Sequence, residues 1–430
     1  MKYHSLNYNS KSTLFNDALI NGIAPDRGLY FPEKIPQLPQ SFFENIEKLS
    51  IPEIAYKVIK PYVGNQILKD KLMDIVSETL DFDFPIVKIT DNIAALELFQ
   101  GPTLAFKDVG ARFMALSLGH LNKDSNQKIT VLVATSGDTG GAVANGFLGV
   151  KGVDVVILYP KGKVSEIQEK QLTTLGQNIT ALEVEGVFDD CQEMVKTAFL
   201  DNSLSSINLT SANSINVARW LPQMFYYFIG YKRLKHKKKK LVFSVPSGNF
   251  GNICAGIMGN QMGLPIDHFI ASTNVNDSVP RYLETGAYDP KTTLQTLSTA
   301  MDVGNPSNFT RIQKIFNNDI AKMKKILSGY RYTDKETKRA LKEIYYLNGY
   351  VADPHGAVGY LGLKEFMSDQ KDDFYGVFLE TAHPVKFLDT VNKTLKLDVE
   401  IPERLKATLS KEKVSIPIRD YSELRAYLLN

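Results

Sequence analysis

Lys107 is the residue of this chain whose type and setting most suggest covalent chemistry. It lies in the stretch ELFQGPTLAFKDVGARFM (97–114), where a run typical of a strand gives way to one typical of a helix. Lysine is usually exposed, because burying its charge costs free energy. The apolar neighbours Phe106 and Val109 predict partial burial, which lowers the pKa of the amine and leaves it nucleophilic enough to form a Schiff base. Lys107 is therefore a candidate nucleophile.

A glycine-rich loop, VPSGNFGN (245–252), follows the apolar run LVFS and could hold a phosphate group. Gly248 and Gly251 allow the backbone to approach a ligand closely, and the next helix offers free N–H groups. In isolation such a loop is more often an ordinary turn, and its spacing matches neither a Walker A loop nor the dinucleotide fingerprint. Beside a neutral amine, however, a phosphate cradle is what a pyridoxal phosphate enzyme requires.

A second polar loop, ATSGDTGG, follows the run ITVLV. It combines the hydroxyl groups of Thr135, Ser136 and Thr139 around Gly137 with the start of a helix, which suits a carboxylate or a phosphate. The alternative is an ordinary helix cap at Asp138 or Thr139. The negative charge of Asp138 disfavours contact between its own side chain and an anion.

A third group of polar residues could bind a second anion. Asn213, Ser214 and Arg219 lie in SANSINVARWLPQ, where a guanidinium and polar side chains come close together in sequence. Without context, Arg219 would be interpreted as a residue on a helix surface. The histidines, including His355 in DPHG and His383 in TAHP, are scattered and form no metal-ligand pattern.

A parallel sheet would bring these loops together, because ligands bind at the carboxyl ends of its strands. Runs such as ITVLVAT, DVVILYP and LVFSVP alternate with helical patterns, which indicates parallel sheets covered on both faces. Helical patterns precede them up to about Leu80, and the first helix is expected to be capped by Ser12 or Thr13. Residues 322–342 predict an exposed helical surface with a glycine-containing break.

Composition favours a protein that acts on small molecules. The 430 residues carry 50 basic and 47 acidic side chains, so the net charge of +3 offers no large field for nucleic acid or an anionic membrane. The basic run at 236–240 predicts a solvated turn before a strand. Two cysteines are too few for a disulfide framework, and no segment resembles a signal peptide or a membrane span. We therefore expect a cytoplasmic protein, either a monomer or a homodimer.

Nearly the whole chain resembles the threonine synthase family, whose members are pyridoxal phosphate enzymes of the fold family that also contains the tryptophan synthase β chain. The matching segments, in the family's order, are GIAPDRGLYFPEKIP, GPTLAFKDVGARFM, ATSGDTGGAVA, LYPKGKVSEIQEKQ, GVFDDCQEMVK, NSINVARWLPQ, PSGNFGN, DPHGAVGY and ETAHPVKF. The resemblance implies a fold type II architecture, in which two doubly wound α/β domains accompany a helical amino-terminal region. The expected limits are 1–85 for the helical region, 86–225 for a smaller domain with Lys107 and the substrate loops, and 226–430 for a larger domain with the cofactor-phosphate loop.

The resemblance also implies roles for individual residues. Lys107 would be linked to the cofactor as a Schiff base and then act as acid and base, while Thr381 would face the pyridine nitrogen with a hydroxyl that cannot hold a full proton there. The implied cofactor-binding residues are Lys107, Ser247, Gly248, Asn249, Phe250, Gly251, Asn252 and Thr381. The implied substrate-binding residues are Thr135, Ser136, Gly137, Asp138, Thr139, Asn213, Ser214, Arg219 and Asn249.

One position departs from a common form of the family pattern. Many relatives have an asparagine where this chain has Asp138, and that amide faces the phenolic oxygen of the cofactor. An ionised carboxylate would repel a phenolate. Asp138 is therefore expected to make this contact only if it is protonated, and otherwise to be turned away.

The implied reaction converts O-phospho-L-homoserine and water to L-threonine and phosphate, the last step of threonine biosynthesis. The nearest alternative is a related lyase, such as a serine or threonine dehydratase, whose substrate has no phosphate for Arg219 to bind. A second alternative is a non-catalytic relative that only binds a phosphorylated metabolite.

Overall fold

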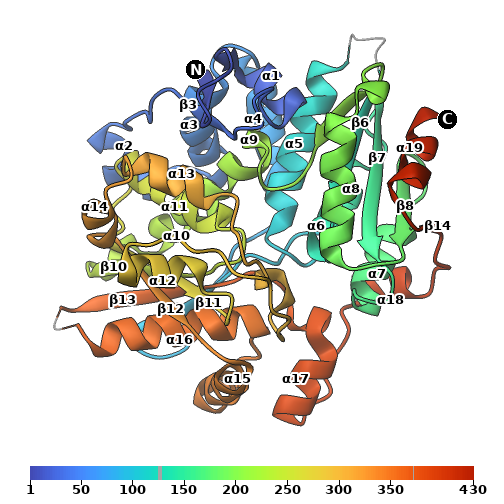
Figure 1. Cartoon of the computed structure of the whole chain (residues 1–430). Helices are drawn as coiled ribbons and strands as arrows, with labels where there is room; N and C mark the ends of the chain where they lie inside the picture. The colour runs from blue at the N-terminus through green and yellow to red at the C-terminus, as the bar shows by residue number, and fades with distance from the viewer. Residues whose placement is uncertain (124–127, 371) are drawn as a thin grey trace.

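The computed structural model describes residues 1–123, 128–370 and 372–430, and two large sheets dominate it (Figure 1). The smaller sheet has the strand order β14-β8-β7-β6-β9, with all of its strand pairs parallel. Its strands are β6 (Ile129–Ala134), β7 (Val153–Pro160), β8 (Ile179–Val184), β9 (Asn208–Ser211) and β14 (Ile416–Ile418). The helices associated with it are α5 (Lys107–Leu121), α6 (Asp138–Phe147), α7 (Glu166–Thr173), α8 (Phe188–Leu200), η2 (Asn202–Leu204), α18 (Glu403–Leu409) and α19 (Tyr421–Leu429).

The larger sheet has the order β12-β11-β10-β13-β5-β4; β4 pairs antiparallel with β5, and the other pairs are parallel. Its strands are β4 (Ile86–Lys88), β5 (Ile93–Glu97), β10 (Lys240–Pro246), β11 (His268–Thr273), β12 (Leu327–Arg331) and β13 (Phe374–Glu380). The helices of this part are α9 (Val217–Trp220), η3 (Leu221–Gln223), α10 (Met224–Leu234), η4 (Lys235–Lys237), α11 (Gly251–Gln261), α12 (Ser278–Thr285), η5 (Thr299–Met301), α13 (Phe309–Ile315), α14 (Ile320–Lys324), α15 (Asp334–Asn348), α16 (Pro354–Ser368), η6 (Pro384–Phe387) and α17 (Leu388–Leu395).

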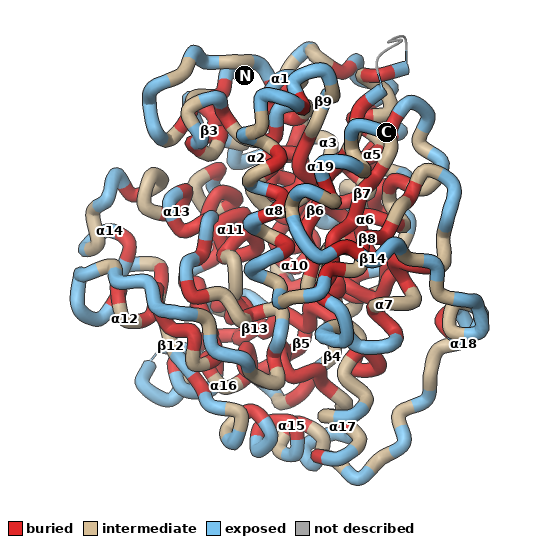
Figure 2. The backbone as a smooth tube through the Cα atoms, turned by 45° about the vertical axis from the view of Figure 1, so that its right-hand side comes forward, coloured by how far each residue is buried: buried red, intermediate tan, exposed pale blue. Residues whose placement is uncertain are grey.

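Alternate residues along the strands are buried on opposite faces, so both large sheets are covered on both sides. Val131 of β6 packs with α5 and α6, whereas Leu132 packs with α8 and α19. In the larger sheet Phe243 of β10 faces α10 and α11, and Val242 faces α15 and α16. This arrangement confirms the predicted doubly wound α/β class. Figure 2 shows the buried backbone concentrated in the strands and the helices between them.

The amino-terminal region contains α1 (Phe15–Asn21), α2 (Gln40–Glu44), η1 (Ile46–Lys48), α3 (Ile51–Val63) and α4 (Lys69–Thr79). Of these, α1, α3 and α4 confirm the predicted helical patterns, whereas α2 and η1 were not predicted. The region also contains a small antiparallel sheet of β1 (Lys2–Ser5), β2 (Thr13–Leu14) and β3 (Tyr30–Pro32). The expected cap at Ser12 or Thr13 is wrong: α1 follows Leu14, which makes no capping bond, because Thr13 pairs with Tyr3 in the sheet.

The stretch 322–342 is not the continuous helical surface that its charge suggested. Strand β12 occupies the glycine-containing break and pairs with β11 at the edge of the larger sheet. Leu327 anchors this strand in the core, while its later residues are half-buried or exposed. The basic turn before β10 lies where the sequence predicted it, since η4 has no buried residue.

Sheet membership crosses the boundaries expected at residues 85 and 225. Strands β4 and β5 join the carboxy-terminal strands in the larger sheet, whereas β14, close to the end of the chain, joins the smaller one. The chain thus passes from one sheet to the other immediately before Lys107. The proposed division into domains stays a prediction.

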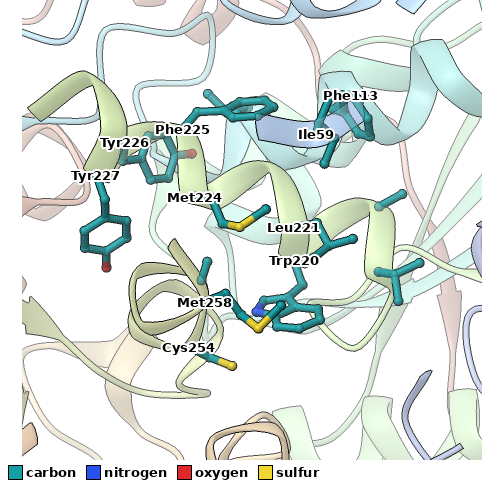
Figure 3. Close-up of a cluster of buried hydrophobic side chains, with 14 of the residues drawn as sticks. Ile59, Phe113, Trp220, Leu221, Met224, Phe225, Tyr226, Tyr227, Cys254 and Met258 are labelled. Atoms are coloured by element: carbon teal, nitrogen blue, oxygen red, sulfur yellow. The ribbon is translucent and has the colours of Figure 1, made fainter. Parts of the chain in front are cut away.

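A shared core of aromatic and sulfur-containing side chains connects the two sheets and the amino-terminal helices. Figure 3 shows Trp220, Met224 and Tyr227 from the α9–α10 segment together with Met258 of α11. Ile59 of α3 and Phe113 of α5 belong to the same cluster. This continuous packing fixes the helices whose ends surround the cavity described next.

Candidate active site

The carboxyl ends of β6, β10 and β13 open onto one cavity of about 520 Å³. This size falls within the range of roughly 300–1,000 Å³ that is usual for small-molecule sites. The predicted site residues that line it are Lys107, Thr135, Ser136, Thr139, Asn213, Ser214, Arg219, Ser247, Gly248, Asn249, Phe250, Gly251, Asn252 and Thr381. Gly137 and Asp138 lie outside the lining formed by the described residues.

Lys107 is the first residue of α5 and is partly buried in this cavity. Burial lowers the pKa of its amine to about 8; Lys386 and Arg219 act in the same direction, and Asp138 opposes them. The positive end of the α5 dipole further favours a neutral amine. Lys107 therefore has the environment that a nucleophilic lysine needs.

The loop after β10 forms a close-fitting wall. A Cβ atom at Gly248 would lie 2.5 Å from the carbonyl oxygen of Ala300, so only glycine fits without a backbone shift. Phe250 adopts a left-handed conformation with φ of 58° and precedes α11, whose first N–H groups face the cavity end of the loop. Buried Asn252 accepts a hydrogen bond from Tyr227 at 2.7 Å, while its Nδ2 has no partner within the described chain. The loop thus offers donors to an anion.

The loop after β6 is organised by one of its own hydroxyl groups. Thr135 Oγ1 accepts the N–H groups of Gly137 at 2.9 Å and Gly140 at 2.8 Å. Its hydroxyl hydrogen is donated to the carbonyl of Gly137 at 3.1 Å. Ser136 and Thr139 line the cavity beside it. Thr135 therefore shapes the loop, and the neighbouring hydroxyls are the ones available to a ligand.

Asp138 is buried and turned toward Lys386, a residue that the sequence did not single out. The two side chains form an ion pair of 2.7 Å, and Gln168 Nε2 donates a hydrogen bond of 3.0 Å to the same carboxylate oxygen. Although burial alone would raise it, the pKa of Asp138 is held well below its usual value by Lys386 and Lys107. Asp138 is thus ionised and engaged away from the cavity. Only the ETAHPVKF resemblance segment contained Lys386, with no signal that it would be buried.

Arg219 and its polar neighbours Asn213, Ser214 and Asn249 line one part of the cavity. Arg219 is 3% exposed, donates to the carbonyl of Ala212, and keeps an Nε that has no partner among the described residues. Burial lowers its pKa to about 10, so the guanidinium stays charged at neutral pH. Asn249 Nδ2 donates to Ser214 Oγ at 2.7 Å, and Asn213 Nδ2 donates to the carbonyl of Ala134 at 3.1 Å. This part of the cavity suits an anion.

Two histidines take different positions. His355, to which the sequence assigned no role in a site, stands in the first turn of α16 and lines the cavity. Its Nε2 accepts the N–H of Ala300 at 3.1 Å, so its ring hydrogen lies on Nδ1, which faces Asp353. The contact joins residues 55 positions apart, so no local pattern of the sequence indicated it. His383 instead accepts the N–H of Val385 at 3.1 Å and caps η6.

Comparison with known proteins connects this geometry to a family. Residues 89–374 match the family model of pyridoxal-phosphate dependent enzymes, and residues 2–80 and 356–428 match the amino-terminal and carboxy-terminal models of threonine synthase. The threonine synthase of Haemophilus influenzae is 44% identical over 437 residues, covering 100% of both chains. This chain belongs to the threonine synthase family. It is accordingly a pyridoxal phosphate-dependent enzyme.

Solved threonine synthase structures share the whole fold. The crystal structure from Escherichia coli superimposes with a TM-score of 0.94 at 39% identity and covers 100% of both chains. The pyridoxal phosphate-bound threonine synthase from Brucella melitensis gives a TM-score of 0.93 at 34% identity, covering 100% of this chain and 98% of its own. The family fold predicted from the sequence is therefore confirmed along its full length.

The cavity of this threonine synthase family member fits the cofactor. Lys107 presents an amine of lowered pKa, Gly248 in the loop lining the cavity packs too closely on the Ala300 carbonyl to carry a side chain, and Asn252 Nδ2 lacks a partner within the described chain. Thr381, buried beside them, supplies a hydroxyl at the end of β13. Residues from both large sheets thus converge on one site.

Among the residues that the structure describes, no helix has the length and apolar character of a membrane span.

Proposed function

We propose that this enzyme converts O-phospho-L-homoserine and water to L-threonine and phosphate. The observation that carries the proposal is the buried guanidinium of Arg219, a residue that lines the same cavity as the Lys107 amine. A substrate that is an amino acid at one end and a phosphate at the other requires both groups. A dehydratase substrate without phosphate would leave Arg219 unused.

The proposed binding mode follows from the polar groups around the cavity. The loop from Ser247 to Asn252 would hold the cofactor phosphate, and Thr381 would face the pyridine nitrogen as a neutral hydrogen-bonding partner. Ser136 and Thr139 would bind the substrate carboxylate, since their hydroxyls line the cavity. The substrate-binding residues of this proposal also include Asn213, Ser214, Arg219 and Asn249, whereas Thr135, Gly137 and Asp138 would hold the loop in shape.

Lys107 would carry the proton transfers. When bound, pyridoxal phosphate supplies the electron sink that stabilises negative charge at the substrate carbon next to the amino group. With a pKa of about 8, the Lys107 amine would hold one added proton at a time: it would accept a proton from Cα, accept one from Cβ only after the first has been released, and return protons to Cγ and Cα. Phosphate would leave Cγ with the bonding electrons, a water molecule would add its hydroxyl at Cβ, and the remaining proton of that water would balance the added negative charge of the released phosphate.

Arg219 would stabilise the departing phosphate. Its guanidinium is buried and already held by the Ala212 carbonyl, so little reorganisation is needed as negative charge develops on the leaving group. We further propose that the enzyme works in the cytoplasm as a monomer or homodimer. Its two cysteines, Cys191 and Cys254, are buried free thiols, which suits that reducing compartment.

The test measures phosphate release from O-phospho-L-homoserine by the holoenzyme, with the amino-acid product identified chromatographically. Wild-type enzyme should form threonine and phosphate in equal amounts. Arg219→Ala should lower kcat/KM by roughly 10²–10³-fold, as for loss of a transition-state charge donor, while the visible absorbance of the bound cofactor is retained. Lys107→Ala should abolish turnover.

Arg233→Ala is the matched control, because Arg233 lies on α10 in a partly exposed ion pair with Asp83. This variant should keep wild-type activity. Absence of threonine from wild-type holoenzyme would refute the proposal. Deamination of serine or threonine in its place would support the dehydratase alternative, and ligand binding unaffected by Lys107→Ala would support a non-catalytic relative.

A further inference from the structure

Arg311 is a fully buried arginine outside the described cavity lining, with an unusual set of partners. It lies on α13, and no acidic group forms an ion pair with it within the described chain. Its Nε and Nη2 donate to the carbonyl of Tyr30 at 3.3 and 3.0 Å, and Nη1 donates to Asn308 Oδ1 at 2.7 Å. Further bonds reach the carbonyls of Ser214 at 3.4 Å and Ile215 at 2.5 Å. Neutral oxygens therefore satisfy the whole guanidinium.

A buried charge without a counter-ion is costly, and proteins normally pair it or neutralise it. Burial lowers the pKa of Arg311 to about 10, which leaves it protonated at neutral pH. Its guanidinium stacks 4.2 Å from the ring of Trp220, and Arg219 is the residue next to that tryptophan. Arg219 likewise has no ion-pair partner among the described residues. Two buried arginines that form no ion pair within the described chain thus lie next to Trp220, with Arg219 in the cavity lining and Arg311 outside it.

The hydrogen bonds of Arg311 also orient the backbone of that wall. The carbonyl oxygens of Ser214 and Ile215 point toward the guanidinium. Since the N–H and C=O groups of a trans peptide point in opposite directions, the N–H of Ile215 faces away from Arg311. Carbonyl oxygens that would repel an anion are therefore held out of the cavity.

A relay from Arg311 reaches the hydroxyl group of Ser214. Asn308, which Arg311 holds through Oδ1, directs its Nδ2 at Ser214 Oγ over 3.4 Å, and Asn249 Nδ2 donates to the same oxygen at 2.7 Å. Both interactions occupy acceptor positions of the hydroxyl. Its hydrogen is left to be donated, and Ser214 lines the cavity.

We propose that Arg311 is a positioning residue for the phosphate group of the substrate, an inference that rests on the proposed function. It keeps the Ser214–Ile215 backbone and the Ser214 hydroxyl in a donor arrangement and adds a second buried positive charge to that of Arg219. Because the Tyr30 carbonyl accepts two of its hydrogen bonds, Arg311 also joins the amino-terminal region to the phosphate subsite.

The test compares ligands with and without a phosphate group on Arg311→Met and Arg311→Lys holoenzymes. In Arg311→Met, the KM for O-phospho-L-homoserine and the inhibition constant of inorganic phosphate should rise by about tenfold, the loss expected when charge-assisted bonds stop ordering a subsite. Binding of L-threonine, followed by visible absorbance of the cofactor, should change by less than about twofold, and kcat should change less than KM. Arg311→Lys should recover part of the phosphate affinity, because it restores the charge but has fewer donors.

Asn308→Ala provides a second variant that interrupts the relay and leaves the charge in place. It should weaken the binding of inorganic phosphate by a smaller factor and leave L-threonine binding unchanged. Arg233→Met should change the binding of neither ligand. The inference would be overturned if inhibition by phosphate were unchanged in both Arg311→Met and Asn308→Ala, or if the binding of phosphate and of L-threonine were weakened equally. Failure of the wild-type enzyme to form threonine would instead refute the proposed function, so the two failures are distinguishable.

Discussion

Replacing Asp138 by Asn should destabilise the enzyme strongly, because it leaves the Lys386 ammonium group buried without a counter-ion. The side chains of this pair are only 4% and 0% exposed, and they lie 2.7 Å apart. Removing one member of a buried ion pair typically costs about 3–5 kcal/mol. Within the described chain Asp138 is the hydrogen-bond acceptor of Lys386 Nζ, so we expect a loss in the upper part of that range.

Replacing the other member of the pair, Lys386, should cost less stability. In Lys386→Met the carboxylate of Asp138 keeps its 3.0 Å bond from Gln168 and the nearby positive charge of Lys107, and the methionine fills most of the lysine volume. We expect a loss of about 2–3 kcal/mol. The double variant should lose no more than Asp138→Asn alone, which corresponds to a coupling energy of roughly 2–3 kcal/mol.

Urea unfolding of the holoenzymes, followed by far-ultraviolet circular dichroism at saturating cofactor, measures these differences. Asp154→Asn is a suitable control, since Asp154 forms its ion pair with Lys128 at an exposed site and should change stability by less than about 1 kcal/mol. Strictly additive losses in the double variant, or a loss below about 1 kcal/mol in Asp138→Asn, would show that the pair does not have the proposed energetic role.

Two further outcomes follow from the site. Burial lowers the pKa of Lys107 from 10.5 to about 8, so between these pH values the folded apoenzyme binds fewer protons than the unfolded chain. The free energy of unfolding of the wild type, relative to that of Lys107→Met, should therefore rise with pH in this window by up to about 1.4 kcal/mol per pH unit. The same pH dependence of this free energy in both proteins, measured by urea unfolding, would contradict the prediction. Gly248→Ala would bring a Cβ atom to 2.5 Å from the Ala300 carbonyl and 2.8 Å from Met301 Cα, so the affinity for pyridoxal phosphate, measured by absorbance titration of apoenzyme, should fall by about tenfold or more. Gly141→Ala, whose Cβ would have no contact closer than 3.4 Å, should bind the cofactor normally.

The strands and their terminal loops could be predicted from the sequence because their signals are local. β6 and β10 are continuous apolar runs, as buried parallel strands require, and each is followed at once by a glycine-containing polar loop. Strand β12 was not predicted, since its residues, among them Ser328 and Gly329, carry little of the β-branched pattern and pair only at a sheet edge. Its pairing depends on contacts far along the chain.

The hidden parts of the site are likewise those that depend on distant partners. Lys386 lies 248 residues from Asp138 in sequence, and only the fold shows that the two charges compensate each other. In the sequence, Arg311 is indistinguishable from an exposed arginine on a helix; only the fold shows that the carbonyls of Tyr30 and Ile215 accept its hydrogen bonds. From sequence alone a charged residue is predicted to be exposed, because its burial depends on partners that only the folded chain brings to it.

The contact between Arg311 and Trp220 also gives the protein a fluorescent reporter of its own. Trp220 is the single tryptophan of the sequence and is fully buried; its ring centroid lies 4.2 Å from Cζ of the guanidinium and 5.9 Å from the ring centroid of Phe31. Indole emission responds to nearby charge and to contact with other groups. Any rearrangement of the phosphate subsite should therefore change the intrinsic fluorescence, so ligand arrival at this part of the cavity can be timed without a label.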